Sequence, residues 1–311
     1  MRSMNFSRLA PALLLLASLL TVSCNSTATK TRPTAYYQPV MGYVPQPQGP
    51  IPAYVPPTFF DSPSQVGDNA PPIHADSYIL VNAQSGTVLA ARNADTFRGA
   101  ASTQKLLTAL IVAEAGNLDK PVRVQASDVA VEPTRLGVKP GDVYTRRQLL
   151  IGFLVKSAND VANVLARDNA GSIAAFSAKM NAKARSLGAT NSSFANPHGL
   201  TAGGQHSTAR DMARIAKACY ENPYIRDAVK RKYFEFRYAN GKTITLKNTN
   251  ELLGRMPECN GMKTGYTVAA GRCLISSAVG RGRAVILVQM GSKTTYIFND
   301  AATLMRWGIS L

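Results

Sequence analysis

The pattern of apolar and polar positions predicts a mixed α and β domain that begins near residue 73. Two short apolar runs, at residues 78–81 and 87–90, flank a turn that contains glycine, and together they predict a β-hairpin. Residues 102–115 place apolar side chains at helical spacing and are followed by Gly116, which predicts a buried helix that ends at the glycine. The folded part of the chain is therefore expected to open with two strands and a helix.

The middle of this region is predicted to be helical and its last third to be sheet. A capping-box sequence, Thr-Arg-Arg-Gln, begins at Thr145 and predicts the start of a helix. The further predicted helices are 160–168, 172–187, 208–220 and about 293–308, and the predicted strands are 242–246, 261–268, 272–279 and 283–289. Strands at both ends of a helical middle predict an α/β (α+β) fold, with an antiparallel sheet flanked by helices and an inserted helical subdomain.

The first residues have the pattern of an export signal. A basic start and an apolar run over residues 9–22 predict a signal peptide that covers residues 1–23, because the run is too short to span a bilayer comfortably. The next residue, Cys24, follows Thr-Val-Ser, which resembles the small-residue sequence before an acylated cysteine in bacterial lipoproteins. We therefore expect a lipid-anchored protein of the bacterial envelope, periplasmic or otherwise extracytoplasmic. Ordinary cleavage after Ala28 is the alternative, and it would remove Cys24.

A proline-rich stretch separates the signal from the folded region. Residues 25–72 hold 11 of the 18 prolines and only four charged residues. Such a composition lacks the apolar material for a core of its own, so residues 24–72 are predicted to form a disordered, semi-rigid tether. The domain boundaries predicted from sequence are therefore 1–23, 24–72 and 73–311.

Overall composition narrows the possible partners. The chain is 45% hydrophobic and 17% charged, enough apolar material for a sizeable core, and its formal net charge is +17. A basic surplus favours anionic partners such as acidic lipid, cell-wall polymer or nucleic acid. Because no aromatic-basic RNA motif or zinc-finger spacing occurs, nucleic acid is not favoured. The three histidines form no His-Glu-x-x-His motif, and no metal or other cofactor is predicted.

The cysteines do not suggest a disulfide framework. Beside Cys24 the chain holds Cys219, Cys259 and Cys273, which are too few for a disulfide-stapled scaffold of this length. We expect these three to be buried free thiols, although export would permit a bridge.

Candidate chemistry begins with Ser102-Thr103-Gln104-Lys105 at the start of the first predicted helix. A spacing of three puts Ser102 and Lys105 on one helical face, with Cβ atoms about 5–6 Å apart. A serine hydroxyl becomes a good nucleophile when an adjacent base takes its proton, and a neutral lysine can be that base. Burial or a neighbouring cation would lower the lysine pKa as this role requires. Taken alone the motif is weak, because chance would supply about one in this composition.

Two later motifs offer complementary groups. Ser157-Ala158-Asn159 lies between two predicted helices, where helix capping is the alternative explanation. Lys263-Thr264-Gly265 lies on a predicted strand and offers a cation and a hydroxyl donor, while its glycine would let a ligand backbone lie against the strand. A solvated lysine on a hairpin is the alternative for this motif.

These three motifs, in this order, form the set found in penicillin-binding proteins and class A β-lactamases. The chain thus resembles the D-alanyl-D-alanine carboxypeptidases, the serine DD-peptidases among the low-molecular-mass penicillin-binding proteins. The resemblance covers residues 73–311 and extends to the segments 196–200, 207–213 and 261–277. It implies an enzyme that removes the terminal D-alanine from peptidoglycan stem peptides ending in D-Ala-D-Ala, with β-lactams as covalent inhibitors.

The resemblance also implies roles for individual residues. Ser102 would be the acyl-enzyme nucleophile, Lys105 its general base, and Ser157 the relay of the proton to the leaving D-alanine. Substrate binding would use Asn159 for the peptide backbone, Lys263 and Thr264 for the terminal carboxylate, and the Gly265 and Tyr266 end of the motif. Backbone N–H groups of Ser102 and Tyr266 would form the oxyanion hole.

Several alternatives remain open at this point. A peptidoglycan DD-endopeptidase or a β-lactamase would have the same fold, and a basic wall-binding or nucleic-acid-binding protein with an inactive site is a remote possibility. A class A β-lactamase needs a glutamate after its Ser-x-Asn motif, and here none occurs between Glu132 and Glu221. Asp160 and Asp168 lie in that stretch and are expected at helix-end or surface positions. A Ser-His-Asp triad using His198 is disfavoured, because no Gly-x-Ser-x-Gly elbow exists.

Overall fold

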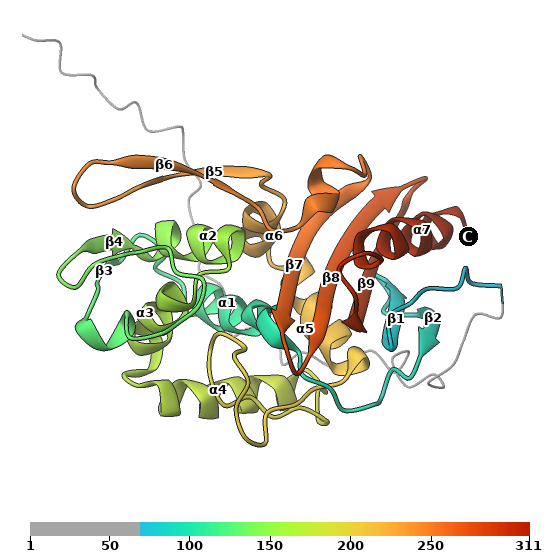
Figure 1. Cartoon of the computed structure of the whole chain (residues 1–311), viewed down its shortest axis with the longest axis horizontal. Coiled ribbons are helices and arrows are strands. Elements are labelled where there is room, and N and C mark those ends of the chain that lie inside the picture. The colour runs from blue at the N-terminus through green and yellow to red at the C-terminus, as the bar shows by residue number, and fades with distance from the viewer. Residues whose placement is uncertain (1–68) are drawn as a thin grey trace, which may run out of the picture. The chain divides into compact units, whose positions relative to one another are not determined.

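An antiparallel five-stranded sheet forms one half of the structure, a computed structural model that describes residues 69–311 (Figure 1). The strand order is β2-β1-β9-β8-β7. The strands are β1 (Ser77–Asn82), β2 (Val88–Arg92), β7 (Cys259–Thr267), β8 (Gly271–Gly280) and β9 (Arg283–Ser292). The predicted signal peptide, Cys24 and the tether up to residue 68 lie outside the described residues.

The two ends of the described chain meet in this sheet. Strand β1 pairs with β9 without a break in register, from Ser77 opposite Met290 to Asn82 opposite Val285. Between β2 and β7 the chain leaves the sheet and forms a largely helical region. This arrangement confirms the predicted antiparallel sheet with an inserted helical subdomain.

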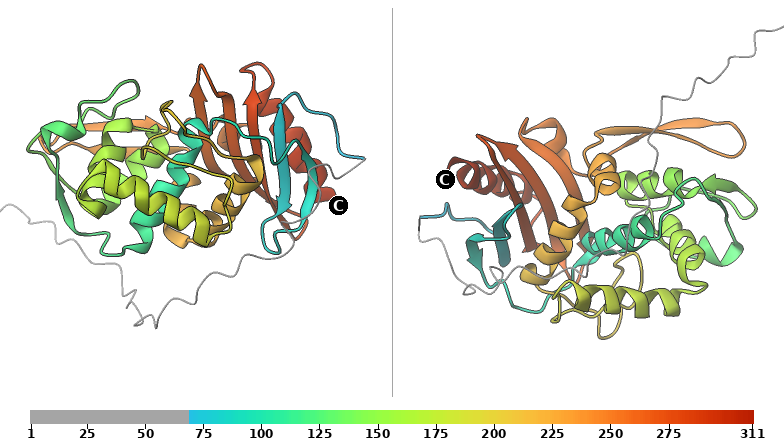
Figure 2. Two further views of the ribbon diagram at one scale, coloured as in Figure 1. Left: turned by 90° about the horizontal axis from the view of Figure 1, so that it is seen from below. Right: turned by 180° about the vertical axis from the view of Figure 1, so that it is seen from behind.

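The helices of the described region lie on both faces of the sheet and in the insert. They are α1 (Lys105–Glu114), α2 (Arg146–Lys156), α3 (Asn159–Ala170), α4 (Ile173–Ser186), α5 (Ala209–Glu221), α6 (Pro223–Val229) and α7 (Ile297–Ser310). Helix α7 covers one face of the sheet and α5 the other (Figure 2). Because side chains alternate along a strand, Ile79 packs on the α5 side and Leu80 on the α7 side.

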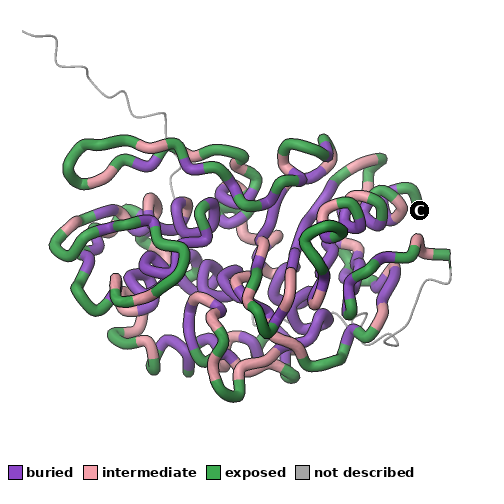
Figure 3. Tube along the Cα trace, in the orientation of Figure 1, coloured by how far each residue is buried: buried purple, intermediate pink, exposed green. Residues whose placement is uncertain are grey.

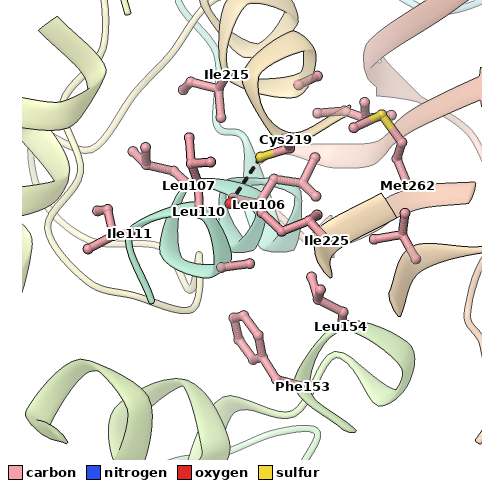
Figure 4. Packing of buried hydrophobic residues seen from close by; sticks show 14 of the residues in the cluster. Leu106, Leu107, Leu110, Ile111, Phe153, Leu154, Ile215, Cys219, Ile225 and Met262 are labelled. Carbon is pink, nitrogen blue, oxygen red and sulfur yellow. Dashed lines mark hydrogen bonds between the residues drawn. The ribbon is translucent and has the colours of Figure 1, made fainter. Parts of the chain in front are cut away.

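Helix α1 runs through the centre of the helical region and is buried along almost its whole length (Figure 3). Leu106, Leu107 and Leu110 pack among side chains from α2, α5, α6 and β7, as Figure 4 shows. Cys219 on α5 donates its thiol to the carbonyl of Leu106 at 3.2 Å. Because these side chains pack closely around α1, the helix and the turn that leads into it are held in one position.

The local predictions hold at the helix ends and at the cysteines. Thr145 caps α2, with its hydroxyl accepting the Gln148 N–H at 3.1 Å and the Gln148 side chain accepting the Thr145 N–H at 3.0 Å. The predicted capping box is therefore confirmed. The cysteines of the described region, Cys219, Cys259 and Cys273, are free and buried, as expected.

The structure adds elements that the pattern did not predict. Strands β3 (Pro121–Arg123) and β4 (Val143–Thr145) form one small ribbon, and β5 (Tyr233–Arg237) pairs with the predicted β6 (Thr243–Lys247) in another. Both ribbons expose much of their surface, so their patterns carry little hydrophobic signal (Figure 3). None of the helices within residues 69–311 has the length and apolar composition needed to cross a bilayer.

Candidate active site

Ser102 and Lys105 meet at the turn that leads into α1. Ala101 to Gln104 form one turn of 3₁₀ helix and α1 begins at Lys105, so the first turn of the predicted helix is tighter than an α-helix. Ser102 is half-buried and faces a cleft, whereas Lys105 is fully buried. Lys105 Nζ lies 2.7 Å from Ser102 Oγ. The structure thus brings the predicted nucleophile and the predicted base into hydrogen-bond contact.

Two further oxygen atoms surround the Lys105 amine. Its Nζ donates to Asn159 Oδ1 at 2.7 Å and to the backbone carbonyl of His198 at 2.5 Å. Burial is the main cause that lowers the pKa of Lys105 well below its ordinary value. The charge of Lys263 lowers this pKa further, and the Asp160 carboxylate opposes both effects. These effects together favour the neutral form of the amine, which is the form that can act as a base.

The second motif spans the junction of α2 and α3. Ser157 follows α2 as a left-handed C-cap with φ 66°, and this turn points the chain back so that Asn159 begins α3. Ser157 lines the cleft. The Asn159 amide contacts Lys105 through its oxygen and the Pro133 carbonyl through its nitrogen. Asn159 therefore holds the lysine, while its predicted contact with substrate backbone stays a prediction.

The third motif lies on β7, at the edge of the sheet beside Ser102. Lys263 is only 1% exposed and donates to the Thr264 carbonyl at 2.9 Å, and burial lowers its pKa to about 7. A Cβ atom on Gly265 would lie 2.8 Å from the Ser102 backbone nitrogen. The structure therefore explains why a glycine stands at position 265 in a way that the sequence did not suggest. The absence of a side chain lets β7 pack directly against the Ser102 turn.

These groups surround an open cleft of about 360 Å³. The predicted residues that line it are Ser102, Ser157, Thr264, Gly265 and Tyr266. Lys105, Asn159 and Lys263 are buried and do not line this cleft. In residues 69–311, no group of three His, Cys, Asp or Glu side chains is placed to hold a metal ion.

Two charged residues of the cleft, Glu251 and Arg272, were missed by sequence reasoning. Glu251 precedes β7 and belongs to no motif, whereas Arg272 lies on β8, inside the segment 261–277 of the family resemblance, which gave this residue no role of its own. The signal that could have found the arginine is the predicted hairpin of the third motif, in which Arg272 lies opposite Tyr266.

The two aspartates considered as alternatives are not surface residues. Asp160 is fully buried near the start of α3, and its carboxylate accepts the N–H groups of Leu136 and Gly137 at 3.0 and 2.8 Å. Asp168 pairs with Lys120 and Arg146 at 2.7 Å each. Both lie toward the ends of α3, which agrees with the helix-end positions expected from sequence. Each carboxylate also ties a loop or helix to its neighbour, and neither lines the cleft.

The fold and the arrangement of serine, buried lysine and edge strand define a serine hydrolase of the penicillin-binding class. The chain belongs to the family described as D-alanyl-D-alanine carboxypeptidase, whose sequence profile matches residues 64–294. It is similar to D-alanyl-D-alanine carboxypeptidase DacB2 of Mycobacterium tuberculosis, with 38% identity over 76% of this chain and 83% of the relative. Family membership confirms the resemblance inferred from the three motifs.

Other relatives and a solved structure agree with this assignment. DacC of Escherichia coli, also a D-alanyl-D-alanine carboxypeptidase, is 36% identical over 81% of this chain, which spans only 65% of that relative. A D-alanyl-D-alanine endopeptidase of Escherichia coli is 33% identical over 76% of this chain and 78% of the relative. The crystal structure of a Mycobacterium tuberculosis D-alanyl-D-alanine carboxypeptidase matches with a TM-score of 0.75 and 36% identity, over 83% of this chain and 97% of that structure.

Proposed function

We propose that this chain is an exported serine D-Ala-D-Ala carboxypeptidase that trims peptidoglycan stem peptides through an acyl-enzyme on Ser102. The observation that carries the proposal is the fully buried Lys105 amine, 2.7 Å from Ser102 Oγ. A neutral amine has two N–H donors and one lone pair. With the donors directed to Asn159 Oδ1 and the His198 carbonyl, the lone pair is left to accept the Ser102 hydroxyl proton.

The proposed reaction proceeds in two steps. In the first, Ser102 Oγ attacks the carbonyl of the penultimate D-alanine while its proton passes to Lys105. The C–N bond then breaks, and the proton passes through Ser157 to the departing D-alanine amine, which leaves an ester on Ser102. In the second step, water attacks the ester with Lys105 again as base, and the serine is restored.

Further hydrogen-bond donors stabilise the negative charges of the reaction, the oxyanion and the terminal carboxylate of the substrate. The backbone N–H groups of Ser102 and Tyr266 stabilise the oxyanion, an effect worth about 3 kcal/mol for each well-aimed donor. Ser102 lies in the first helical turn, where backbone N–H groups have no partner within the helix. Thr264, which lines the cleft, donates its hydroxyl to the terminal carboxylate of the substrate.

The proposal extends to location. The signal peptide over residues 1–23 exports the chain, acylation of Cys24 anchors it, and the proline-rich tether spaces the enzyme from the membrane. In the envelope the chain, which loses Arg2 and Arg8 with the signal peptide, still has a net charge of +15 and meets anionic wall polymer and lipid.

A DD-endopeptidase activity is the second candidate. A relative that bears that name covers most of this chain, and the same acyl-enzyme serves both reactions. In the endopeptidase reaction the leaving amine belongs to a neighbouring stem peptide instead of a free D-alanine. Comparing release of D-alanine from monomeric stem peptides with cleavage of cross-linked dimers measures the balance between the two activities.

The test of the acyl-enzyme is a covalent label. A fluorescent penicillin should attach to the native chain, and mass mapping should place it on Ser102. Ser102→Ala should lose the label and keep the fold, whereas Ser85→Ala, at an exposed serine outside the cleft, should keep it. A label on another serine, or no label on folded protein, contradicts the proposal.

A further inference from the structure

A single arginine, Arg272, lines the cleft among the described residues. It lies on β8 directly opposite Tyr266, and its guanidinium carbon is 4.6 Å from the centre of the Tyr266 ring. On another side its Nε donates to Thr294 Oγ1 at 2.9 Å. The guanidinium is thus held in place by a stacking contact and a hydrogen bond, which reduces the entropy that binding a ligand would cost.

The charge of Arg272 is not matched within the described part of the chain. It forms no ion pair in residues 69–311. The acidic residue of the same cleft, Glu251, pairs with Arg255 at 3.4 Å. A guanidinium presents several N–H donors in one plane, a geometry that matches a carboxylate. Within the described residues, the cleft therefore contains a fixed cation that has no ion-pair partner.

The lysine of the third motif is poorly placed to serve as this cation. Lys263 is 1% exposed, and its amine donates to the Thr264 carbonyl behind the cleft surface. A carboxylate that entered the cleft would meet the half-buried Arg272 without displacing any hydrogen bond of Lys263.

From this geometry we infer that Arg272 binds a carboxylate of the peptide substrate, in a subsite that it forms with the hydroxyls of Thr264 and Thr294. The inference deepens the proposed function and rests on it. Two carboxylates have this chemistry in a stem peptide, the C-terminal group and a side-chain group farther up the peptide. Either would pair with the guanidinium in a charge-assisted hydrogen bond.

The test compares Arg272→Met with the native enzyme on two peptides. One is a diacetyl-lysyl-D-Ala-D-Ala peptide, whose one carboxylate is C-terminal, and the other carries an added side-chain carboxylate in place of the acetylated amine. Arg272→Met should raise KM by roughly 10- to 100-fold with little change in kcat, as expected when binding is lost equally from ground and transition states. Arg306→Met, which removes a charge on α7 outside the cleft, should leave KM unchanged.

The two arms identify the carboxylate. A rise in KM on both peptides assigns Arg272 to the C-terminal group. Amidating that terminus should then raise the KM of the native enzyme without raising the KM of the variant further. A rise confined to the second peptide assigns it to the side-chain group. If KM is unchanged on both, the inference is overturned while the proposed function stands. If the native chain forms no penicillin adduct on Ser102, the proposed function itself fails.

Discussion

At the residue scale, the Lys105 amine is the group whose protonation governs the proposed chemistry. Its burial and the nearby charge of Lys263 both lower its pKa, and a base acts only above its own pKa. Acylation by penicillin should therefore rise with pH through the Lys105 pKa and level off well below the ordinary lysine value of about 10.4. Stopped-flow labelling between about pH 5 and 10 measures this profile.

A matched variant separates this explanation from simple packing. Lys105→Arg keeps a long cationic side chain that does not lose its proton in proteins, so acylation should fall by at least about 100-fold at every pH. A rate that keeps rising beyond the ordinary lysine pKa, or an active arginine variant, would show that Lys105 is not the base.

Lys263 supports a stability prediction at the same scale. It is buried and burial lowers its pKa to about 7, so the unfolded chain binds a proton that the folded chain loses between about pH 7 and its ordinary value near 10.4. Stability should accordingly rise with pH in that window. At pH 7 and below, Lys263→Met should increase the free energy of unfolding by about 1–3 kcal/mol, because a buried polar group is removed.

Urea unfolding of the two proteins checks this prediction. The advantage of Lys263→Met should shrink as the pH is raised, since the native lysine is then buried without charge. Lys247→Met, at an exposed lysine on β6, is the control and should change stability little at any pH. A methionine variant no more stable than the native chain at pH 7 would contradict the argument.

At the scale of elements, the segment 196–200 supports the turn that carries Ser102. The His198 carbonyl accepts from Lys105, and Gln104 donates to the Asn196 carbonyl at 2.6 Å. Gly199 has φ 89°, and a Cβ atom there would overlap the Ala101 carbonyl and lie 2.9 Å from the Ser102 nitrogen. Contact between this segment and the turn therefore requires glycine.

Gly199→Ala should displace the Ser102 turn. We expect penicillin acylation to fall by about 100-fold, as a displacement of about 1 Å does elsewhere, and stability to fall by more than about 1 kcal/mol. Gly203 lies in the same stretch, and a Cβ there would touch nothing within 4 Å, so Gly203→Ala should be close to neutral. Equal effects of the two substitutions would mean that Gly199 does not position the turn.

For the whole molecule, the lifetime of the penicilloyl ester separates a peptidase from a β-lactamase. The stretch from Ser157 to Glu221 lacks an internal glutamate, and the two aspartates nearest to Ser157, Asp160 and Asp168, are held in other contacts. The bulky penicilloyl group stays where a departing D-alanine would have made room for water, and no second base is placed to activate water from another side. The adduct should therefore be long-lived and penicillin turnover far slower than peptide turnover. Intact-mass spectrometry over time measures this lifetime.

The cleft provides one carboxylate against which to test that conclusion. Glu251 is the acidic residue that lines the cleft in the described region, and Glu251→Gln should leave the adduct lifetime unchanged. An adduct lost within about a second, with a lifetime extended in Glu251→Gln, would instead indicate a β-lactamase that uses this glutamate.

Anchoring is the other prediction that concerns the whole molecule. If Cys24 is acylated, radiolabelled fatty acid should enter the native chain and not Cys24→Ala, and the variant should be released in soluble form. Cys219→Ala is the control, because that thiol is buried in the core and should not affect anchoring. A Cys24→Ala chain that stays equally membrane-bound would place the anchor elsewhere.

Sequence alone determined the features that depend on neighbours along the chain. The apolar run of β1, the capping box at Thr145 and the spacing of Ser102 and Lys105 involve residues a few positions apart. Local sterics and helical geometry decide such features, so their pattern is visible before folding. The order of the three motifs indicated the family, and with it the sheet and its helical insert.

Only the tertiary structure decided which groups surround the reacting atoms. The His198 carbonyl at Lys105, the backbone of Gly265 against Ser102, and Arg272 in the cleft come from segments far apart in sequence. The position of a backbone carbonyl, or a close contact between two backbone segments, cannot be predicted from the residue types of the sequence alone. The lowered lysine pKa values likewise arise from burial among distant elements, and burial of a charged side chain follows from packing and not from periodicity.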